Sequence, residues 1–452
     1  MMAEQIPNGW IATSLAEIAS KLVDGSHNPP AKQTTGLPML SAVNINDNKI
    51  LFSDFRLITE SGFKQEDQRT KIASGDVLLT IVGAIGRTAV VPEGIQKFTL
   101  QRSVAVITPV LVPSKFLMYQ IESPRVAQYF KDNARGTAQK GVYLKTLGAT
   151  EIWLPPLAEQ HRIVAKIEEL FSELDQGVAS LKTAREQLKV YRQSLLKNAF
   201  EGKLTAATGW REKSLGQLLG FLTSGSRGWA AYYATSGDLF VRAQNIKHDR
   251  LELNDVAFVA LPGKAEGLRT RIQQGDLLIT ITGANVTKSA LVKHDLGVAY
   301  VSQHVALCRP TTEILPKYLY WFIVAEAAGR KQLTDMAYGA GKPGLNLENI
   351  RSVNVPFPSL REQQEIVEQI ESKFSEADQL DQTLVTALQQ ADALRQSILK
   401  KAFHGQLVKQ AKNEEPATAL LERIRAEKLN GMKSQANRGT PVNILLLHTV
   451  IN

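Results

Sequence analysis

The chain has 452 residues, of which 44% are hydrophobic and 21% are charged, and its formal net charge is +9 at pH 7. This length exceeds that of one ordinary domain, so we expect two or three globular units. The single cysteine, Cys308, excludes an intramolecular disulfide and a zinc site built from several thiolates.

Segments that cross a membrane are not predicted. No stretch approaches the roughly 20 apolar residues of a membrane helix, and residues 1–10 lack a signal-peptide pattern. We therefore expect a cytoplasmic protein that makes no contact with a membrane. The basic surplus favours a polyanionic partner such as nucleic acid, although a surplus of this size also fits an ordinary soluble surface.

The first distinctive motif along the chain is Asn28-Pro29-Pro30, which resembles the catalytic Asn-Pro-Pro of adenine N6-methyltransferases. In those enzymes an aromatic residue follows the prolines and stacks on the flipped base, whereas Ala31 takes this place here. A methyl donor would also need a glycine-rich turn leading from a strand into a helix, and we recognise no G-x-G-x-x-G segment that would supply it. The prolines oppose helix and the preceding Asp24-Gly25-Ser26 is typical of a turn, so the motif predicts a loop.

The chain is a tandem duplication. "GWIATSLAEIASKLVDGS" from Gly9 matches "GWREKSLGQLLGFLTSGS" from Gly209 at an offset of 200 residues, and the offset reaches 203 at the end of each half. In both halves a Gly-Asp pair, beginning at Gly75 and Gly275, precedes an apolar run rich in β-branched residues and then a glycine turn. This pattern predicts a buried strand, so each half opens with a globular part of strands and short helices.

Each half ends in a long predicted helix. After "LPPL" and "FPSL", apolar residues recur in steps of three and four, which is typical of a coiled-coil-like seam, and about 40 residues at ~1.5 Å each make a rod of about 60 Å. The predicted seam residues are Ile163, Ile167, Leu170, Leu174, Val178, Leu181, Ala184, Leu188, Tyr191 and Leu195 in the first helix, and Ile366, Ile370, Phe374, Ala377, Leu380, Leu384, Leu388, Ala391, Leu394 and Ile398 in the second.

Two copies of one unit that associate through the same surface form a two-fold arrangement, so the rods should run antiparallel. The alternative, in which each helix lies along its own domain, predicts a wider and shorter apolar stripe. We therefore predict an elongated, pseudo-two-fold molecule in which two α/β (α+β) domains are joined by two antiparallel coiled-coil-like helices. The predicted segments are residues 1–153 and 205–356 for the globular domains, 154–204 and 357–407 for the helical spacers, and 408–452 for a C-terminal tail.

Taken together, these segments resemble the specificity (S) subunit of type I restriction-modification enzymes over about residues 5–430. The resemblance is carried by "RQSLLKNAFEGKL" and "RQSILKKAFHGQL", "PLAEQ" and "SLREQQ", the "GWxxxSL" openings, "GDVLLT" and "GDLLIT", and the C-terminal "ALLERIRAEK". Each motif alone is moderately specific, whereas their duplicated order is a strong signal.

The resemblance implies that the globular parts are target recognition domains, each reading one half of a split, asymmetric DNA site, while the helices set the unread spacer. It also implies two methyltransferase (M) subunits that bind S-adenosylmethionine and restriction (R) subunits that use ATP and Mg. The S subunit of that family catalyses nothing, which agrees with Ala31, and we expect this chain to bind no cofactor itself. In that family the C-terminal tail returns to the first domain.

In the family's recognition domains, two loops approach DNA: one after the first helix, and one containing glycine before the strand that leads to the long helix. Polar and basic side chains there could reach base edges or phosphates, and glycines let backbone N–H groups approach phosphate. A solvated-surface role fits each side chain equally well, and for His304, beside an apolar run, a half-buried histidine is favoured over a DNA contact. The predicted DNA-binding residues are Ser26, His27, Asn28, Lys32, Arg87, Arg102, Gly136, Gln139, Lys140 and Tyr143 in the first half, and Ser226, Arg227, Trp229, Lys288, Gln303, His304, Lys342 and Asn346 in the second.

The "RQSLLKNAF" and "RQSILKKAF" segments are a docking surface for M subunits by resemblance. The alternative for their basic residues is a complement to the helix macrodipole, and the two phenylalanines are expected to pack on the domain that follows each helix. The predicted partner-binding residues are Arg192, Lys197, Phe200, Arg395, Lys400, Lys401 and Phe403.

Two further stretches need separate interpretation. "YGAGKPG" could suggest a nucleotide phosphate loop, but Met336 stands where the first glycine belongs and Pro343 follows Lys342 in place of Ser or Thr. The last stretch, "GTPVNILLLHTVIN", departs from the family pattern and is either packed or a frameshift-like extension.

We therefore predict a non-catalytic DNA-specificity subunit without a metal site. A rod-like scaffold whose globular ends bind proteins is the alternative, and the two differ in the salt dependence of DNA binding. A self-contained methyltransferase, the second alternative, would bind the methyl donor alone.

Overall fold

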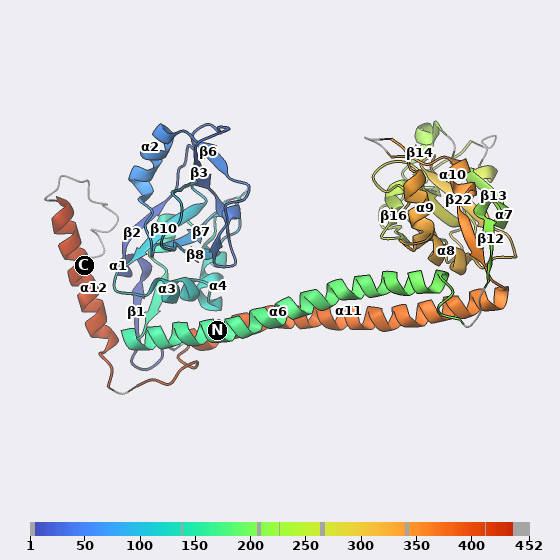
Figure 1. Cartoon of the computed structure of the whole chain (residues 1–452). Coiled ribbons are helices and arrows are strands. Elements are labelled where there is room, and N and C mark those ends of the chain that lie inside the picture. Colours follow the sequence, from blue (N-terminus) through green and yellow to red (C-terminus); the bar gives the residue numbers. More distant parts are fainter. Residues whose placement is uncertain are drawn as a thin grey trace. The chain divides into compact units, whose positions relative to one another are not determined.

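The computed structural model describes residues 5–136, 139–205, 209–225, 227–262, 267–339, 343–411 and 413–436. The chain divides into two compact units, one formed by residues 1–179 with 387–452 and the other by residues 180–386. Helices α6 (Leu157–Phe200) and α11 (Leu360–Phe403) each run through both units. Each unit therefore combines one globular domain with a segment of each long helix (Figure 1).

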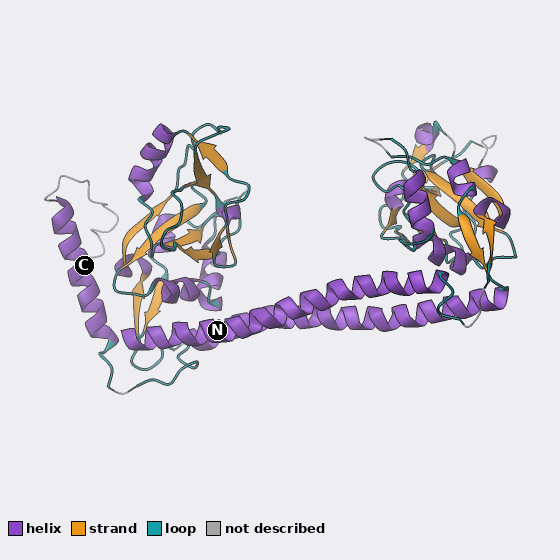
Figure 2. Cartoon of the chain, viewed as in Figure 1, coloured by secondary structure: helices purple, strands orange, loops and turns teal. Residues whose placement is uncertain are grey.

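The first domain is built on an antiparallel sheet, which we call the scaffold sheet, with strand order β2-β10-β7-β8. Gly75 and Asp76 lead into β7, whose four residues are all buried, so the predicted buried strand is confirmed. Helix α3 packs against this sheet (Figure 1 and Figure 2). Phe116 on α3 is fully buried. The bounds are β2 (Ala19–Asp24), β7 (Val77–Thr80), β8 (Thr88–Val90), β10 (Val104–Pro109), α3 (Ser114–Ile121) and α4 (Pro124–Asn133).

A smaller lobe completes the first domain. In its sheet, of order β6-β3-β9, the pair β3 and β9 is parallel and the pair β3 and β6 is antiparallel. The Asn-Pro-Pro motif has no regular structure, and Arg56 donates to the carbonyl of Pro30 at 2.7 Å, so the predicted loop is confirmed. The bounds are β3 (Leu37–Leu40), β4 (Ile45–Asn46), β5 (Lys49–Ile50), β6 (Arg56–Ile58), α2 (Glu60–Thr70) and β9 (Thr99–Leu100).

A two-stranded sheet fixes the start of the chain next to the start of α6. Strand β1 (Ile11–Ser14) pairs with β11 (Glu151–Leu154), and α1 (Leu15–Ile18) and α5 (Leu144–Gly148) lie beside this pair. Trp10 Nε1 donates to Glu159 Oε1 on α6 at 3.1 Å.

The second domain repeats this plan, with a scaffold sheet of order β13-β22-β19-β20 and the pair β12-β23. Its lobe differs: it has a four-stranded sheet, β14-β18-β15-β21, and an aromatic 3-10 turn, η2, precedes β14, while the 3-10 turn η4 corresponds to the end of α2 at the offset of 200. The bounds are β12 (Arg211–Ser214), α7 (Leu215–Leu218), β13 (Leu219–Ser224), η2 (Trp229–Tyr232), β14 (Tyr233–Ala234), β15 (Asp238–Val241), β16 (Ile246–Lys247), β17 (Arg250–Leu251), β18 (Ala257–Val259), η4 (Leu268–Thr270), β19 (Leu277–Thr280), β20 (Ser289–Leu291), β21 (Ala299–Val301), β22 (Val305–Pro310), α8 (Pro316–Val324), α9 (Gly329–Met336), α10 (Leu347–Arg351) and β23 (Asn354–Phe357).

The long helices pair antiparallel. In the second unit Arg185 donates to Asp381 at 2.8 Å and Arg192 donates to Asp378 at 2.7 Å, so residue numbers fall along α11 as they rise along α6. The guanidinium of Arg192 also lies 5.3 Å from the ring centre of Phe374. The predicted antiparallel pairing is therefore confirmed.

The first unit holds the same contact with the two helices exchanged. Arg395 of α11 pairs with Asp175 of α6, and its guanidinium lies 4.1 Å from the ring centre of Phe171. Because these residues correspond to Arg192, Asp378 and Phe374 at an offset of 203, the duplication extends to interhelix contacts.

The predicted apolar seam is wrong at three positions. Tyr191, Leu380 and Leu394 are 44%, 50% and 51% exposed. Next to Leu380, the charged Asp381 faces α6 and accepts from Arg185. An apolar repeat of three and four residues does not distinguish these adjacent positions. The ion pairs between α6 and α11, some of them beside an aromatic ring, determine which residue faces the other helix.

Helix α12 (Ala417–Ala436) has no counterpart in the second unit among the residues that the structure describes. It packs on α1, with Ile424 fully buried in the core of the first domain. Lys428 Nζ donates to the carbonyls of Ala16 and Glu17 at 2.6 and 2.9 Å, and Arg425 donates to the Glu17 carboxylate. The tail thus returns to the first domain as far as residue 436, whereas the apolar stretch that ends the sequence lies outside the described residues.

Candidate nucleic-acid interface

The predicted DNA-binding loops of the first domain converge at one end of the scaffold sheet. The Arg102 N–H donates to the carbonyl of Ser26, and the Ile81 N–H donates to the carbonyl of Ser103, both at 2.9 Å. The Val142 N–H donates to the carbonyl of Ile81 at 2.8 Å. These bonds join the loop after β2, the start of β10, the end of β7 and the segment before α5. Residues far apart in sequence therefore form one surface, which we call the loop end.

A hairpin between Arg135 and Gly141, the glycine hairpin, belongs to this surface. Its two end residues exchange both backbone hydrogen bonds, at 2.9 and 2.8 Å, and Gly83 N–H donates to the carbonyl of Lys140 at 3.1 Å. Gly136 has φ of 118°, which other residues rarely adopt. The hairpin is thus held against the turn after β7.

The second domain places its loops in the same way. Tyr338 and Gly344 exchange both backbone hydrogen bonds at the stem of its glycine hairpin, at 3.1 and 2.9 Å. The Ile281 N–H donates to the carbonyl of His304 at 2.9 Å, and the Leu345 N–H donates to the carbonyl of Ile281 at 2.8 Å. The loop end is therefore a property of the repeated fold.

The expectation that the sequence holds no G-x-G-x-x-G segment is wrong. Gly339, Gly341 and Gly344 have the spacing G-x-G-x-x-G, yet the segment follows α9 and Gly344 bridges to Thr282 after β19. A dinucleotide-type turn leads from a strand into a helix, which this segment does not do.

Most predicted contact residues are exposed. Their side chains or bare glycine surfaces face solvent. They are His27, Asn28, Lys32, Arg87, Arg102, Gly136, Gln139, Lys140 and Tyr143 in the first domain, and Arg227, Gln303, His304 and Asn346 in the second.

The loop after β2 is also held by α2. Ser26 is 5% exposed, and its Oγ donates to Glu66 at 2.8 Å, so Ser26 shapes the loop and does not present its side chain to DNA. His27 Nε2 lies 2.7 Å from Asp24 Oδ2, and Arg69 of α2 pairs with the same carboxylate. Helix α2 therefore positions His27.

Two expectations in the second domain are corrected: a DNA contact by Trp229 and a half-buried position for His304. Trp229 is 7% exposed; its ring stacks on Phe240 at 5.6 Å and meets Tyr300 edge-on at 5.4 Å, so it is part of the lobe's core and not a DNA contact. His304 is exposed, and its Nε2 lies 3.1 Å from Gln303 Nε2.

Four predicted residues remain: the side chains of two have partners within the domain, and the other two residues lie outside the described ranges. Lys288 is partly exposed and lies 3.8 Å from the Asp249 carboxylate, so part of its charge is neutralised within the domain. Asn346 uses its side-chain oxygen to accept from the Asn349 N–H at 2.8 Å at the start of α10. Ser226 and Lys342 lie outside the described residues.

Sequence reasoning missed one position of the glycine hairpin. Arg135 and Tyr338 occupy its first stem position in the two domains, and both are exposed, Tyr338 to 61%. A cation and an aromatic ring are the two side-chain types that meet phosphates and bases most readily. The signal was the residue before each aligned glycine, which we had not included.

The predicted partner-binding residues fall into three groups. Arg192 and Arg395 are engaged between α6 and α11. Phe200 and Phe403 are 7% and 2% exposed, packing on Tyr318 of the second domain and Phe116 of the first, so they hold helix ends to domain cores and are not surface contacts. The exposed members are Lys197, Lys400 and Lys401.

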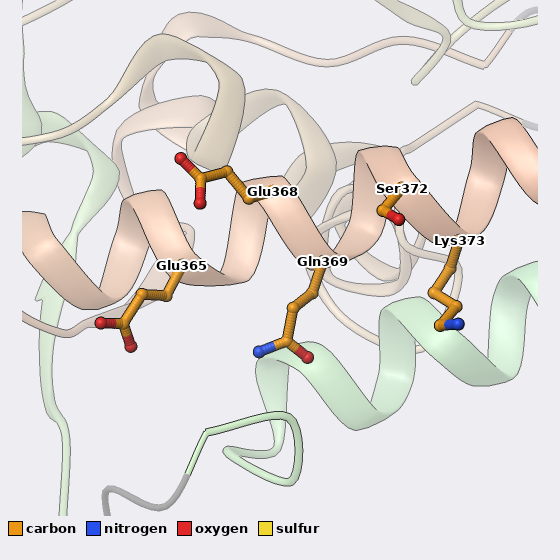
Figure 3. A pocket seen from close by; sticks show the side chains of 5 residues that line it. All are labelled: Glu365, Glu368, Gln369, Ser372 and Lys373. Carbon is orange, nitrogen blue, oxygen red and sulfur yellow. The ribbon is translucent and has the colours of Figure 1, made fainter.

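Metal clusters, membrane spans and hollows were sought among the residues that the structure describes. Within the described ranges no group of three or more His, Cys, Asp or Glu is placed to hold a metal, and no described helix is long and apolar enough to span a membrane. Figure 3 shows a hollow on α11 whose five lining side chains come from one helix: Glu365, Glu368, Gln369, Ser372 and Lys373. We assign it no part in the interface because all of its lining residues lie on α11 and none belongs to a loop-end segment.

A family model described as "Type I restriction modification DNA specificity domain" matches residues 9–182 and 253–390. The chain belongs to this family. The match includes most of both recognition domains and large parts of α6 and α11. The chain is therefore a type I DNA specificity subunit, and the resemblance seen in the sequence is confirmed.

Relatives match along nearly the whole chain. The EcoKI specificity subunit of Escherichia coli strain K12 is 26% identical over 472 residues, covering 97% of this chain and 99% of that protein. The StySPI specificity subunit of Salmonella potsdam is 25% identical over 455 residues, covering 94% and 96%.

Solved structures share the fold. A chain described under "Structural basis underlying complex assembly and conformational transition of the type I R-M system" superposes with a TM-score of 0.69 and 21% identity, covering 89% of this chain and 100% of that chain. The HsdS subunit from Thermoanaerobacter tengcongensis gives a TM-score of 0.54, also at 21% identity, covering 89% and 98%. The predicted architecture of duplicated α/β domains and paired long helices agrees with both.

Proposed function

We propose that this specificity subunit recognises a bipartite, asymmetric DNA site, each recognition domain reading one half with its loop end. The observation that carries this proposal is the repetition of one loop-end backbone with different side chains. Arg135 and Tyr143 of the first glycine hairpin correspond to Tyr338 and Asn346 of the second. Different side chains on equal backbones favour different half-sites.

The charges at the loop end support binding to duplex DNA. Arg87, Arg102 and Lys140 are exposed there, and no ion pair to any of them is found within the part of the chain that the structure describes. Exposed cations gain most from contact with phosphates because their field is not neutralised by neighbouring carboxylates.

Partner methyltransferase subunits, which would carry S-adenosylmethionine, are proposed to dock on the exposed faces of α6 and α11. Tyr191 and Leu394 correspond at an offset of 203, and both are exposed although apolar. Lys197 and Lys400 correspond at the same offset and are exposed as well. Equal surfaces on the two helices would suit two copies of one partner. ATP-dependent restriction subunits, with their Mg, would join this core.

The test is selection from a random duplex library by the purified chain with its methyltransferase partner, at two salt concentrations. We expect enrichment of two short motifs separated by an unread gap, and steep weakening as salt rises. Salt-sensitive binding without an enriched motif would leave a nonspecific DNA binder. No binding at either salt concentration would favour a protein scaffold instead.

A further inference from the structure

A short turn that the predicted contact set omits follows the first parallel strand of each lobe. In the first domain this turn is η1 (Ala42–Asn44), and buried Asn44 holds it. Asn44 Oδ1 accepts from the Ser41 N–H at 2.9 Å, while Nδ2 donates to the carbonyls of Leu51 and Ser53 at 3.0 and 2.7 Å. We call this element the Asn-capped turn.

The second domain has the same turn with the same bonds, η3 (Ala243–Asn245). Asn245 is 2% exposed; its Oδ1 accepts from the Arg242 N–H at 3.0 Å, and its Nδ2 donates to the carbonyls of Glu252 and Asp255 at 3.1 and 2.9 Å. A fully satisfied buried amide in each copy makes the turn a rigid mount.

Both turns lie at the loop end. In the first domain the Ala42 N–H donates to Ser103 Oγ at 3.0 Å, beside Arg102. In the second domain Asn285, in the turn after β19, donates to the carbonyl of Ala243 at 3.3 Å. Each turn therefore contacts segments that already belong to the candidate interface.

The two turns differ at the tip. Between the shared Ala and Asn stands Val43 in the first domain, 62% exposed, and Gln244 in the second, also exposed. The Val43 side chain belongs to none of the hydrophobic cores formed by the described residues. The Gln244 side chain donates one long hydrogen bond, of 3.3 Å, to the Asp255 carboxylate. A rigid turn that is repeated in both domains, and that carries a different exposed side chain in each, is what a sequence-reading position requires.

We propose that the Asn-capped turn reads a base in the major groove in each domain. Val43 packs against the 5-methyl group of a thymine, and Gln244 bonds to the N6 and N7 edge of an adenine, because those side-chain types match those edges. This inference rests on the proposed function, since it assigns base contacts within the bipartite site.

The experiment uses the complex of full-length chain and methyltransferase partner on its selected duplex. Each thymine of the first half-site is replaced in turn by deoxyuridine, which removes only the methyl group, and each adenine of the second by 7-deaza-adenine, which removes only the N7 acceptor. Binding is measured for wild type, Val43→Ala and Gln244→Ala. Leu111→Ala and Gln274→Ala are matched controls, because these exposed residues follow β10 and precede β19 at the opposite end of each scaffold sheet.

We expect one deoxyuridine to weaken wild-type binding about threefold to fivefold and to have no effect on Val43→Ala. One 7-deaza-adenine should weaken wild-type binding about fivefold or more and have no effect on Gln244→Ala. The control variants should respond as wild type does, and all variants should melt as wild type does, because the changed side chains are exposed.

The outcomes distinguish failure of this inference from failure of the proposed function. If a split motif is enriched but the variants stay as sensitive to the altered bases as wild type, the base assignments are wrong and bipartite recognition stands. If no split motif is enriched, both fail together.

Discussion

The two recognition domains keep the same buried aspartate but neutralise it differently. Asp76, 1% exposed, accepts from Lys21 at 2.8 Å and from the hydroxyl of Thr108. Asp276, also 1% exposed, accepts two bonds of 2.8 Å from Arg309. Arg309 replaces Thr108 in the alignment of the two sheets, so the cation comes from β22, the counterpart of β10, and not from the counterpart of β2.

The change is coupled to a second one. The position of Lys21 is taken by Phe221 in the second domain, and the Arg309 guanidinium lies 5.6 Å from that ring. The two domains therefore differ at two positions and still each contain a buried aspartate paired with a cation. The difference shows that the scaffold is maintained by compensation, whereas the loop-end tips diverge without a compensating partner, as expected of residues that face a ligand and not the core.

The largest expected effect is loss of this aspartate. Asp76→Ala should destabilise the first domain and Asp276→Ala the second by about 3–5 kcal/mol each, because each change leaves a cation without its carboxylate. Hydrogen exchange followed by mass spectrometry would show which domain opens. Asp47→Ala, at an exposed turn, is the control. Equal loss of protection in both domains from either variant would contradict the comparison.

The next effect concerns α12, which only the first unit has. Ile424→Ala should weaken docking of α12 on α1 by about 2–5 kcal/mol, because the buried side chain leaves a cavity. Hydrogen exchange should rise in α12 and α1 and stay unchanged in α7, the counterpart of α1. The control is Leu429→Ala, at a position 42% exposed, which should shift nothing appreciably. If Ile424→Ala leaves the hydrogen-exchange protection of α12 unchanged, contacts other than those of Ile424 hold the helix on α1.

Glycines behind the loop end should give a smaller effect. A methyl group on Gly25 would overlap the carbonyl of Leu100, and one on Gly225 would overlap the carbonyl of Val301. Gly25→Ala and Gly225→Ala should each cost about 1–3 kcal/mol and displace the loop after β2 or β13. Urea unfolding of each variant measures this cost, with Gly220→Ala as the control, because a methyl group there would meet no atom closer than 3.8 Å. Unchanged midpoints would contradict the close approach.

The smallest expected effect is a pH dependence of α12 docking. Burial lowers the pKa of Lys428 to about 8, and the nearby Glu17 carboxylate opposes this shift. The docked helix then binds fewer protons than the free helix between about pH 8 and the ordinary lysine value of 10.5. Docking should therefore strengthen as pH rises through this window and stay constant below pH 8.

A nitroxide label on Glu427→Cys, an exposed position of α12, reports docking by its mobility. Lys428→Met should dock independently of pH. A label whose mobility increases from pH 8 to pH 10, or a methionine variant with the wild-type response, would contradict the assignment.

Much of the fold followed from internal repetition. The duplicated Gly-Asp strands and the two long helices were predictable because the apolar period and the offset are carried by local sequence. Which of two adjacent positions faces the other helix, as at Leu380 and Asp381, was not, because that choice depends on a cation from another helix.

The candidate site was predictable as loops but less so as residues. The exposure of Arg87 and Arg102 was predictable because both are charged residues in loops. The burial of Trp229 was not, because it depends on Phe240 and Tyr300, which lie elsewhere in the sequence. The Asn-capped turn was missed because its signal, Ala-x-Asn-Ile in both halves, has meaning only once the asparagine is seen to be buried.

The central claim is that each loop end reads its own half of a split site, and paired loop variants test it most directly. Arg87→Ala with Arg102→Ala alters the first loop end, and Gln303→Ala with His304→Ala alters the second. Motif selection with the partner methyltransferase should show relaxed sequence preference in one half only, a different half for each pair. Relaxation of both halves by either pair, or of neither half by both, would contradict the account.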